Sequence, residues 1–219
     1  MDFKYILSKT DHTLLKPGST EKEILNLIQE GLEYKVASIC IPPSFVHFAH
    51  QTSKDINICT VVGFPNGYNT TSTKLKETEQ ALKGGASEID MVINIGALKD
   101  KKYKLVEDEI REIKDITHNN ILKVIIETCL LTEEEKITMC KIISDAGVDY
   151  IKTSTGFSIA GATVSDIELF KKHVDSKVKI KAAGGIRTLE DAKMYLDLGC
   201  DRIGASSIVA AVKHIAGIW

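Results

Sequence analysis

Short apolar runs rich in β-branched residues alternate with longer segments of helical periodicity along the whole chain. Eight of these runs predict strands, at residues 6–11, 37–41, 58–62, 88–94, 122–127, 149–153, 178–182 and 202–204. Continuous apolar runs of this length are typical of parallel strands that helices cover on one face.

The segments between the runs predict helices, at residues 20–32, 73–82, 101–116, 132–146, 164–173, 188–198 and 207–218, with a short helix opening at Pro43. Thr20 followed by Glu23 has the spacing of a capping box. Thr132 and Thr188 also precede acidic residues, which favour a helix N-terminus.

A weak repeat supports one architecture for the whole chain. Gly85, Gly147 and Gly199 each precede a short spacer, an acidic residue and a strand, so each glycine would end a helix. Eight βα units in 219 residues predict a (β/α)8 barrel, an α/β fold in one domain over residues 1–219. A doubly wound open sheet is the alternative, although no GxGxxG motif follows the first strand.

Composition indicates an ordinary globular protein. The chain is 43% hydrophobic and 26% charged with a net charge of -2, which predicts neither nucleic-acid binding nor a membrane span. Charged residues interrupt the N-terminal segment, so no secretory signal is expected. Five cysteines without CxxC spacing predict reduced thiols in a cytoplasmic protein.

Unusual polar residues stand where the predicted strands end, and barrel active sites lie at the carboxyl ends of the strands. These residues are Asp11, His12, Asp90, Glu127, Lys152 and Lys181. A lysine in a buried strand is costly unless its ammonium is paired or loses its charge. One alternative is that Lys152 only extends its ammonium to solvent.

Lys152 and Lys181 lie on neighbouring predicted strands at comparable depth. Two ammonium groups about 4 Å apart repel by about 4 kcal/mol at an effective dielectric of about 20. Such repulsion would lower the pKa of one lysine by up to about three units. With Asp90, the two lysines therefore suggest a Schiff-base site. Separate ion pairs without catalytic function are the alternative.

Glycine-rich turns follow the last three predicted strands, at residues 154–156, 183–186 and 204–207. Backbone amides in such turns, beside a helix N-terminus, favour a phosphorylated ligand. Tight turns without a ligand are the alternative. His47 and His50 lack a third ligand nearby, so no metal site is predicted.

Several motifs in order resemble the deoxyribose-phosphate aldolases, in their short bacterial form, over nearly the full chain. The motifs are DHTLLKP at 11–17, VGFP at 62–65 with Gly67 and NTT at 69–71, EIDMVIN at 88–94, YIKTSTGF at 150–157, KAAGGIRT at 181–188 and RIGASS at 202–207. The chain departs from the family pattern at CIPP, residues 40–43, and at IAG, residues 159–161.

The resemblance implies a class I aldolase barrel that needs no cofactor or metal. It implies reversible cleavage of 2-deoxy-D-ribose 5-phosphate to D-glyceraldehyde 3-phosphate and acetaldehyde, in deoxynucleoside catabolism. Lys152 matches the Schiff-base lysine, Lys181 the lysine that lowers its pKa, Asp90 the acid/base and Asp11 a supporting acid. The phosphate-binding positions match Gly156, Gly184, Gly185, Gly204, Ser206 and Ser207.

Other functions compatible with the residues are a different phosphate-binding barrel enzyme, such as an isomerase or another class I aldolase, and an inactive barrel that binds sugar phosphates as a regulator. Retention of Asp90, Lys152 and Lys181 argues against an inactive barrel. A homo-oligomer, such as a dimer, is expected because barrels of this size often pair through helices.

Overall fold

In a computed structural model that describes residues 2–215 and 217, eight parallel strands close into a barrel in chain order. The strands are β1 (Thr10–Thr13), β2 (Ser38–Ile41), β3 (Ile58–Val62), β4 (Glu88–Val92), β5 (Ile121–Ile125), β6 (Tyr150–Lys152), β7 (Lys179–Ala183) and β8 (Arg202–Ala205). Parallel pairing of β1 with β8 closes the ring. The (β/α)8 prediction is confirmed, and the open-sheet alternative is wrong.

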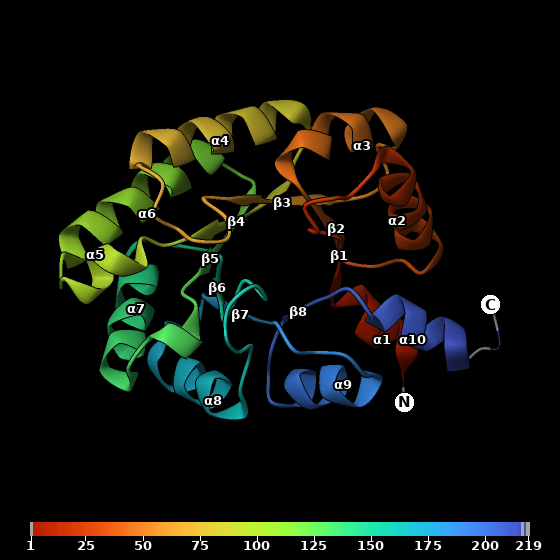
Figure 1. Cartoon of the computed structure of the whole chain (residues 1–219). Helices are drawn as coiled ribbons and strands as arrows, with labels where there is room; N and C mark the ends of the chain where they lie inside the picture. The colour runs from red at the N-terminus through yellow and green to blue at the C-terminus, as the bar shows by residue number, and fades with distance from the viewer. Residues whose placement is uncertain (1, 216, 218–219) are drawn as a thin grey trace.

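Helices surround the strands in Figure 1, which looks along the barrel. They are α1 (Phe3–Ser8), α2 (Glu21–Glu33), α3 (Val46–Thr52), α4 (Thr71–Gly84), α5 (Ile95–Lys99), α6 (Tyr103–Thr117), α7 (Glu133–Asp145), α8 (Val164–His173), α9 (Leu189–Asp197) and α10 (Ile208–Ile215), with 3-10 turns η1 (Pro43–Phe45) and η2 (Thr128–Leu130). The predicted single domain includes residues 1, 216, 218 and 219, and the predicted last helix includes 216 and 218. These four residues lie outside the part of the chain that the structure describes.

Local sequence signals place the helix ends. Thr20, Thr132 and Thr188 each accept a hydrogen bond from the backbone N–H three residues on, and the acidic side chain there accepts one from the threonine N–H. The predicted capping box at Thr20 therefore forms, and two more form at Thr132 and Thr188. Such caps satisfy backbone groups that the first helical turn leaves unpaired. No described helix is long and apolar enough to cross a membrane.

The predicted strand at residues 6–11 is wrong in its first half. Ile6 and Leu7 belong to α1, where both are buried, and β1 begins only at Thr10. The helix forms because Phe3, Ile6 and Leu7 share helical spacing and the Asp2 carboxylate caps the N-terminus by accepting from the Tyr5 N–H at 3.1 Å.

Two other predicted strands extend too far. The run at 88–94 ends at Val92, because the Asn94 side chain accepts from the Ala97 N–H at 3.0 Å and caps α5, a helix not predicted. The run at 122–127 ends at Ile125. Glu127 then takes a left-handed backbone conformation, with φ 53°, that no strand continues.

Side chains alternate in direction along each strand, so apolar residues face the helices while the charged residues face the inside of the barrel. On β4 and β5, Ile89, Leu122 and Val124 pack outward in the hydrophobic core beneath the helices. The intervening residues point into the barrel. The register pairs Asp90 with Lys123 and Lys152 with Lys181, so charged side chains from neighbouring strands meet inside the barrel.

Candidate active site

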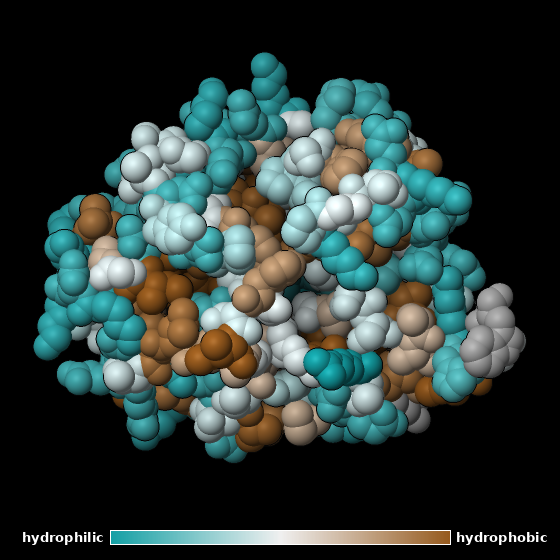
Figure 2. Space-filling view, viewed as in Figure 1, coloured by the Kyte–Doolittle hydropathy of each residue, from teal (hydrophilic) through white to brown (hydrophobic). Residues whose placement is uncertain are grey.

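A cavity of ≈ 460 Å³ opens at the carboxyl ends of the strands. Its lining includes Lys152 and all six residues predicted to bind phosphate, Gly156, Gly184, Gly185, Gly204, Ser206 and Ser207. Figure 2 shows hydrophobic and neutral surface at the centre of this face, surrounded by hydrophilic side chains at the rim. The sequence-predicted positions therefore surround one cavity, although their phosphate role stays a prediction.

Lys152 and Lys181 meet at one carboxylate. Each ammonium nitrogen lies 2.7 Å from the same oxygen, Oδ2 of Asp90, and all three side chains are buried. The prediction that the two lysines approach each other is confirmed in position, with Asp90 between them. Lys152 is only 3% exposed, so the alternative that it merely extends its ammonium to solvent is wrong.

The buried carboxylates hold Lys181 in its charged form. Burial disfavours the ammonium, but the charges of Asp11 and Asp90 outweigh burial and raise the pKa of Lys181 above its ordinary value of 10.5. Asp11 contacts Lys181 directly through Oδ2. Asp11 thus lies where the resemblance expected a supporting acid.

Asp90 is held as a carboxylate. Burial opposes its ionisation, but Lys123, Lys152 and Lys181 outweigh burial and keep the pKa of Asp90 well below its ordinary value of 3.8. Its second oxygen, Oδ1, accepts from Lys123 at 2.9 Å and from the Cys59 thiol at 3.1 Å. The two oxygens of Asp90 therefore face different sets of partners.

Three residues of the site are absent from the sequence-based prediction: Lys123, Glu88 and Arg202. Lys123 Nζ lies 2.5 Å from a Glu88 oxygen, and Arg202 bridges Glu88 at 3.3 Å and Asp11 at 2.5 Å. Lys123 carries the signal that identified Lys152, a lysine within an apolar run. Glu88 lies two residues before Asp90 and so shares its face of β4.

Buried thiols border the same carboxylates. Cys40 and Cys59 are register partners on β2 and β3, and the five cysteines are free thiols, as predicted. Cys59 lies near enough to Asp90 and to Asp11 for two metal-like groupings. Lysine and arginine already bind those carboxylates, so the donor set does not favour a metal ion. His47 and His50 both lie on α3, one of the helices around the barrel, whereas this cluster lies on the strands.

Glycines let two loops of the cavity wall touch. Gly184 has φ 84°, a left-handed conformation, and a Cβ on it would lie 2.9 Å from the Gly161 Cα. A Cβ on Gly161, part of the departure from the family pattern at 159–161, would in turn clash with the Gly184 carbonyl, so close contact between the loops after β6 and β7 requires glycine at both positions. The Ala162 N–H extends this contact by donating to the Gly184 carbonyl at 3.2 Å.

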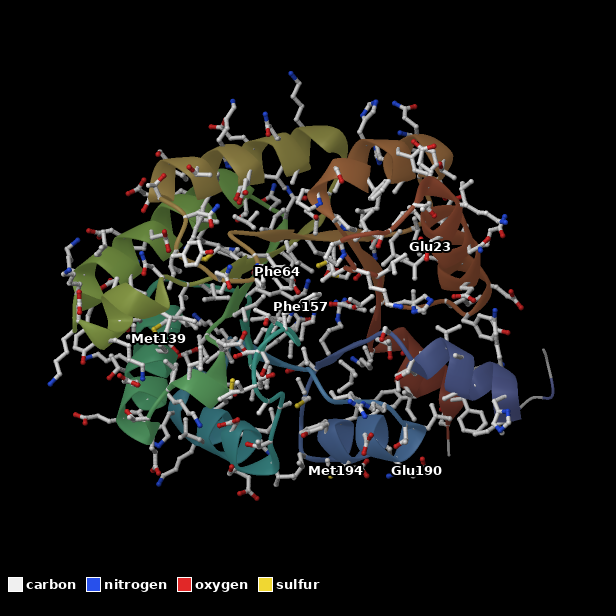
Figure 3. All side chains as sticks on the ribbon, in the orientation of Figure 1. Glu23, Phe64, Met139, Phe157, Glu190 and Met194 are labelled. Carbon is white, nitrogen blue, oxygen red and sulfur yellow. The ribbon has the colours of Figure 1, made fainter. Side chains whose placement is uncertain are left out.

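Glu127 fixes the loop that begins after β6. Its Oε2 accepts from the Thr155 hydroxyl at 2.5 Å and from the Thr155 N–H at 3.2 Å. Phe157, in the same loop, meets Phe64 from the loop after β3, with ring centroids 5.2 Å apart in an edge-to-face arrangement. Figure 3 shows the two rings together over the middle of the barrel. The loop is therefore held on both sides of Gly156, at Thr155 and at Phe157.

Comparison with known proteins agrees with this geometry. A family model described as DeoC/LacD family aldolase matches residues 6–213. A curated relative from Clostridium botulinum named deoxyribose-phosphate aldolase is 58% identical over 209 residues, which are 95% of each chain.

Solved structures give the same picture. An aldolase named QR15 superposes with a TM-score of 0.93 at 39% identity, covering 97% of this chain and 96% of its own. The tetrameric deoxyribose phosphate aldolase of Aeropyrum pernix superposes with a TM-score of 0.91 at 27% identity, covering 100% of this chain and 94% of its own.

Proposed function

This chain belongs to the DeoC/LacD family of aldolases, and from that membership we propose that it cleaves 2-deoxy-D-ribose 5-phosphate reversibly to D-glyceraldehyde 3-phosphate and acetaldehyde. The nucleophile is Lys152, and the reaction serves deoxynucleoside catabolism. One observation carries the mechanism: of the buried lysines that the structure describes around Asp90, only Lys152 lines the cavity.

The reaction begins when the neutral Lys152 amine adds to the C1 aldehyde of the open-chain sugar phosphate. Loss of water leaves an iminium that accepts electrons from the adjacent carbon–carbon bond. Addition also withdraws Lys152 Nζ from its contact with Asp90 Oδ2. That oxygen then becomes available to accept a proton.

Asp90 acts as the acid/base. Through a water molecule it takes the proton of the C3 hydroxyl, C3 becomes the aldehyde carbon of glyceraldehyde 3-phosphate, and the C2–C3 bond breaks. The electron pair of the broken C2–C3 bond moves to C2 and gives an enamine that is attached to Lys152. Asp90 returns a proton to C2, and hydrolysis of the resulting iminium releases acetaldehyde and frees the lysine.

The glycine loops hold the other end of the substrate. Gly156, Gly184, Gly185 and Gly204 bring backbone close to the cavity, and Ser206 and Ser207 add hydroxyls, all without a bulky side chain. Binding the phosphate there fixes the sugar so that C1 reaches Lys152. The phosphate end supplies orientation, and the lysine cluster supplies the chemistry.

Trapping tests the nucleophile. Acetaldehyde with sodium borohydride should reduce an iminium to a secondary amine and add an ethyl group to the peptide that carries Lys152. The Lys152→Met variant should show no label there and no aldehyde release. Lys136→Met, which removes a lysine that binds Asp166 outside the barrel, serves as control and should label normally. Label on another lysine, with none on Lys152, would refute the assignment.

We further propose that the chain forms a homo-oligomer such as a dimer, supported by the tetrameric relative from Aeropyrum pernix, and that it works in a reducing cytoplasm, supported by its free thiols. Light scattering on the purified protein measures the assembly directly, and a monomeric mass across micromolar concentrations would refute it.

A further inference from the structure

The inside of the barrel holds a single connected cluster of charges. Among the described residues its carboxylates are Asp11, Glu88 and Asp90, and its cations are Lys123, Lys152, Lys181 and Arg202. None is more than 9% exposed. Charges this deeply buried are stabilised by one another rather than by water.

The cluster balances only when one cation loses its proton. Three carboxylates face four cations, so the protonated cluster carries one excess positive charge. A buried excess charge is unfavourable, so the cation with the fewest carboxylate contacts is the one expected to lose its proton. Lys181 and Arg202 each contact two carboxylates, and Lys123 contacts three, whereas Lys152 contacts Asp90 alone.

We propose that Glu88 and Lys123, which touch no part of the cavity, are positioning residues that set the ionisation of Lys152 by fixing the net charge of the buried cluster. The proposal rests on the assignment of Lys152 as nucleophile and extends it. In this proposal the net charge of the whole cluster, rather than repulsion by Lys181 alone, determines the ionisation of Lys152.

Groups from every side of Lys152 take part. Asp90 on β4 and Lys181 on β7 face it directly, and the Cys40 thiol on β2 lies within its electrostatic reach. Behind Asp90 lie Lys123 on β5 and Cys59 on β3. Behind Lys181 lies Asp11 on β1, with Arg202 on β8 connecting Asp11 to Glu88.

The charge count predicts shifts of opposite sign for two variants. Glu88→Gln keeps the size and an acceptor oxygen but removes a negative charge, so neutral Lys152 should prevail at lower pH. Lys123→Met removes a positive charge, so neutral Lys152 should require higher pH. Lys123 and Lys152 both contact Asp90, so we expect Lys123→Met to shift the pH at which Lys152 becomes neutral by about one pH unit. Glu88 is more distant, so its shift should be smaller.

The measurement is the pH dependence of Lys152 labelling by acetaldehyde and cyanoborohydride. Short reactions across pH 5 to 10 are digested, and the ethylated peptide is quantified by mass spectrometry. The pH midpoint of labelling is compared between the unmodified protein and each variant, after circular dichroism has shown that the variant is folded.

Glu88→Gln decides the proposal even if Lys123→Met does not fold, because it is the milder change. A lower midpoint in Glu88→Gln supports the charge count, and an unchanged or higher midpoint overturns it. The double variant Lys123→Met with Glu88→Gln restores the balance and should return the midpoint toward that of the unmodified protein. A double variant that retains the full shift of Lys123→Met would also overturn the proposal.

Glu109→Gln is the matched control. Glu109 is a buried acid 2.8 Å from a buried lysine, Lys74, but it lies on α6 outside the barrel, so its removal should leave the midpoint unchanged. Labelling of Lys152 in the unmodified protein tests the proposed function separately. If Lys152 is labelled but no variant moves the midpoint, the inference fails and the nucleophile assignment stands.

Discussion

Asp90 is the residue on which the site converges. Its Oδ2 faces Lys152 and Lys181, and its Oδ1 faces Lys123 and the thiol of Cys59. A carboxylate so surrounded stays ionised, which suits the proton-accepting role that we propose for Asp90. In the proposed mechanism, Oδ1 stays bound to Lys123 and Oδ2 transfers the proton.

Asp90→Asn tests that role at nearly constant shape. Turnover should fall by about 100-fold or more, because an amide cannot take the C3 hydroxyl proton. The KM for the sugar phosphate should change only a few-fold, because the glycine loops that we propose to bind the phosphate are intact. Steady-state aldehyde release measures both constants.

Asp166→Asn is the control for Asp90→Asn, since Asp166 is a buried, lysine-paired aspartate on α8 outside the barrel. It should retain normal turnover. Equal turnover in Asp90→Asn and the unmodified protein would contradict the acid/base assignment.

The elements around the cavity differ in how their positions are specified. The strands are fixed by a closed register, whereas the loops after β6 and β7 depend on each other, through Gly161 against Gly184 and the Ala162 hydrogen bonds. Both loops contribute lining to the same cavity. We therefore expect a change in one loop to disturb the other.

Gly184→Ala should separate these two loops. The new Cβ would meet the Gly161 Cα at 2.9 Å, on a backbone with φ 84° that alanine adopts poorly. We expect the KM for the phosphorylated substrate to rise by about tenfold or more, a loss of roughly 1.4 kcal/mol of binding. Kinetics with and without the phosphate group on the substrate would show the effect only for the phosphorylated form.

Gly147→Ala is the control for Gly184→Ala. Gly147 also has a left-handed backbone, with φ 66°, so alanine there introduces similar backbone strain, but the space around it is open and the new Cβ makes no steric contact. Gly147→Ala should lower thermal stability yet leave the KM unchanged. A similar rise in KM for both variants would show that general destabilisation, not loop contact, is responsible.

Local signals account for what the sequence predicted correctly among these elements. Capping boxes and apolar runs act over a few residues, so the barrel and most helices could be read directly. The error at residues 6–11 arose because a short apolar pair fits a strand or a helix equally well. Glu127 could be noticed as a strand-end acid, but its contact with Thr155 depends on a loop path that no local pattern specifies.

The site was only partly predictable for a similar reason. Lys152, Lys181 and Asp90 are each charged residues within apolar runs and could be found singly. Lys123 carries the same signal in the middle of β5, away from the strand end. Its contact with Asp90 follows from the stagger of the closed barrel, which decides which strand face points inward.

In the whole molecule, ionisable groups are buried in the barrel interior and also beneath the helices. His12, on β1, lies 2.7 Å from Glu30 on α2, and Glu30 also binds Lys213 on α10. Burial lowers the pKa of His12 below its ordinary value of 6.5, although Glu30 opposes the shift. Folding therefore depends on pH at two separate places.

Stability should fall in two stages as the pH decreases. The unfolded chain protonates His12 below about pH 6.5 while the folded protein resists, so stability is lost from there downward. Asp11 and Asp90 have lowered pKa values when folded, so a second loss begins as the unfolded carboxylates protonate near pH 3.8. Thermal melts from pH 8 to 3 measure both stages.

His12→Gln should remove the first stage and leave the second. Constant melting temperature in the unmodified protein between pH 7 and 5 would contradict the assignment to His12.

Pairing of β1 with β8 has a consequence for the newly made chain. Asp11 emerges early in synthesis, but its partners Lys181 and Arg202 are added some 170 and 191 residues later. Until β8 is in place, the ring is open and the cluster lacks Arg202, one of its four cations. A partly synthesised chain on the ribosome therefore holds Asp11 without the guanidinium that binds it in the closed barrel, until the last strand docks.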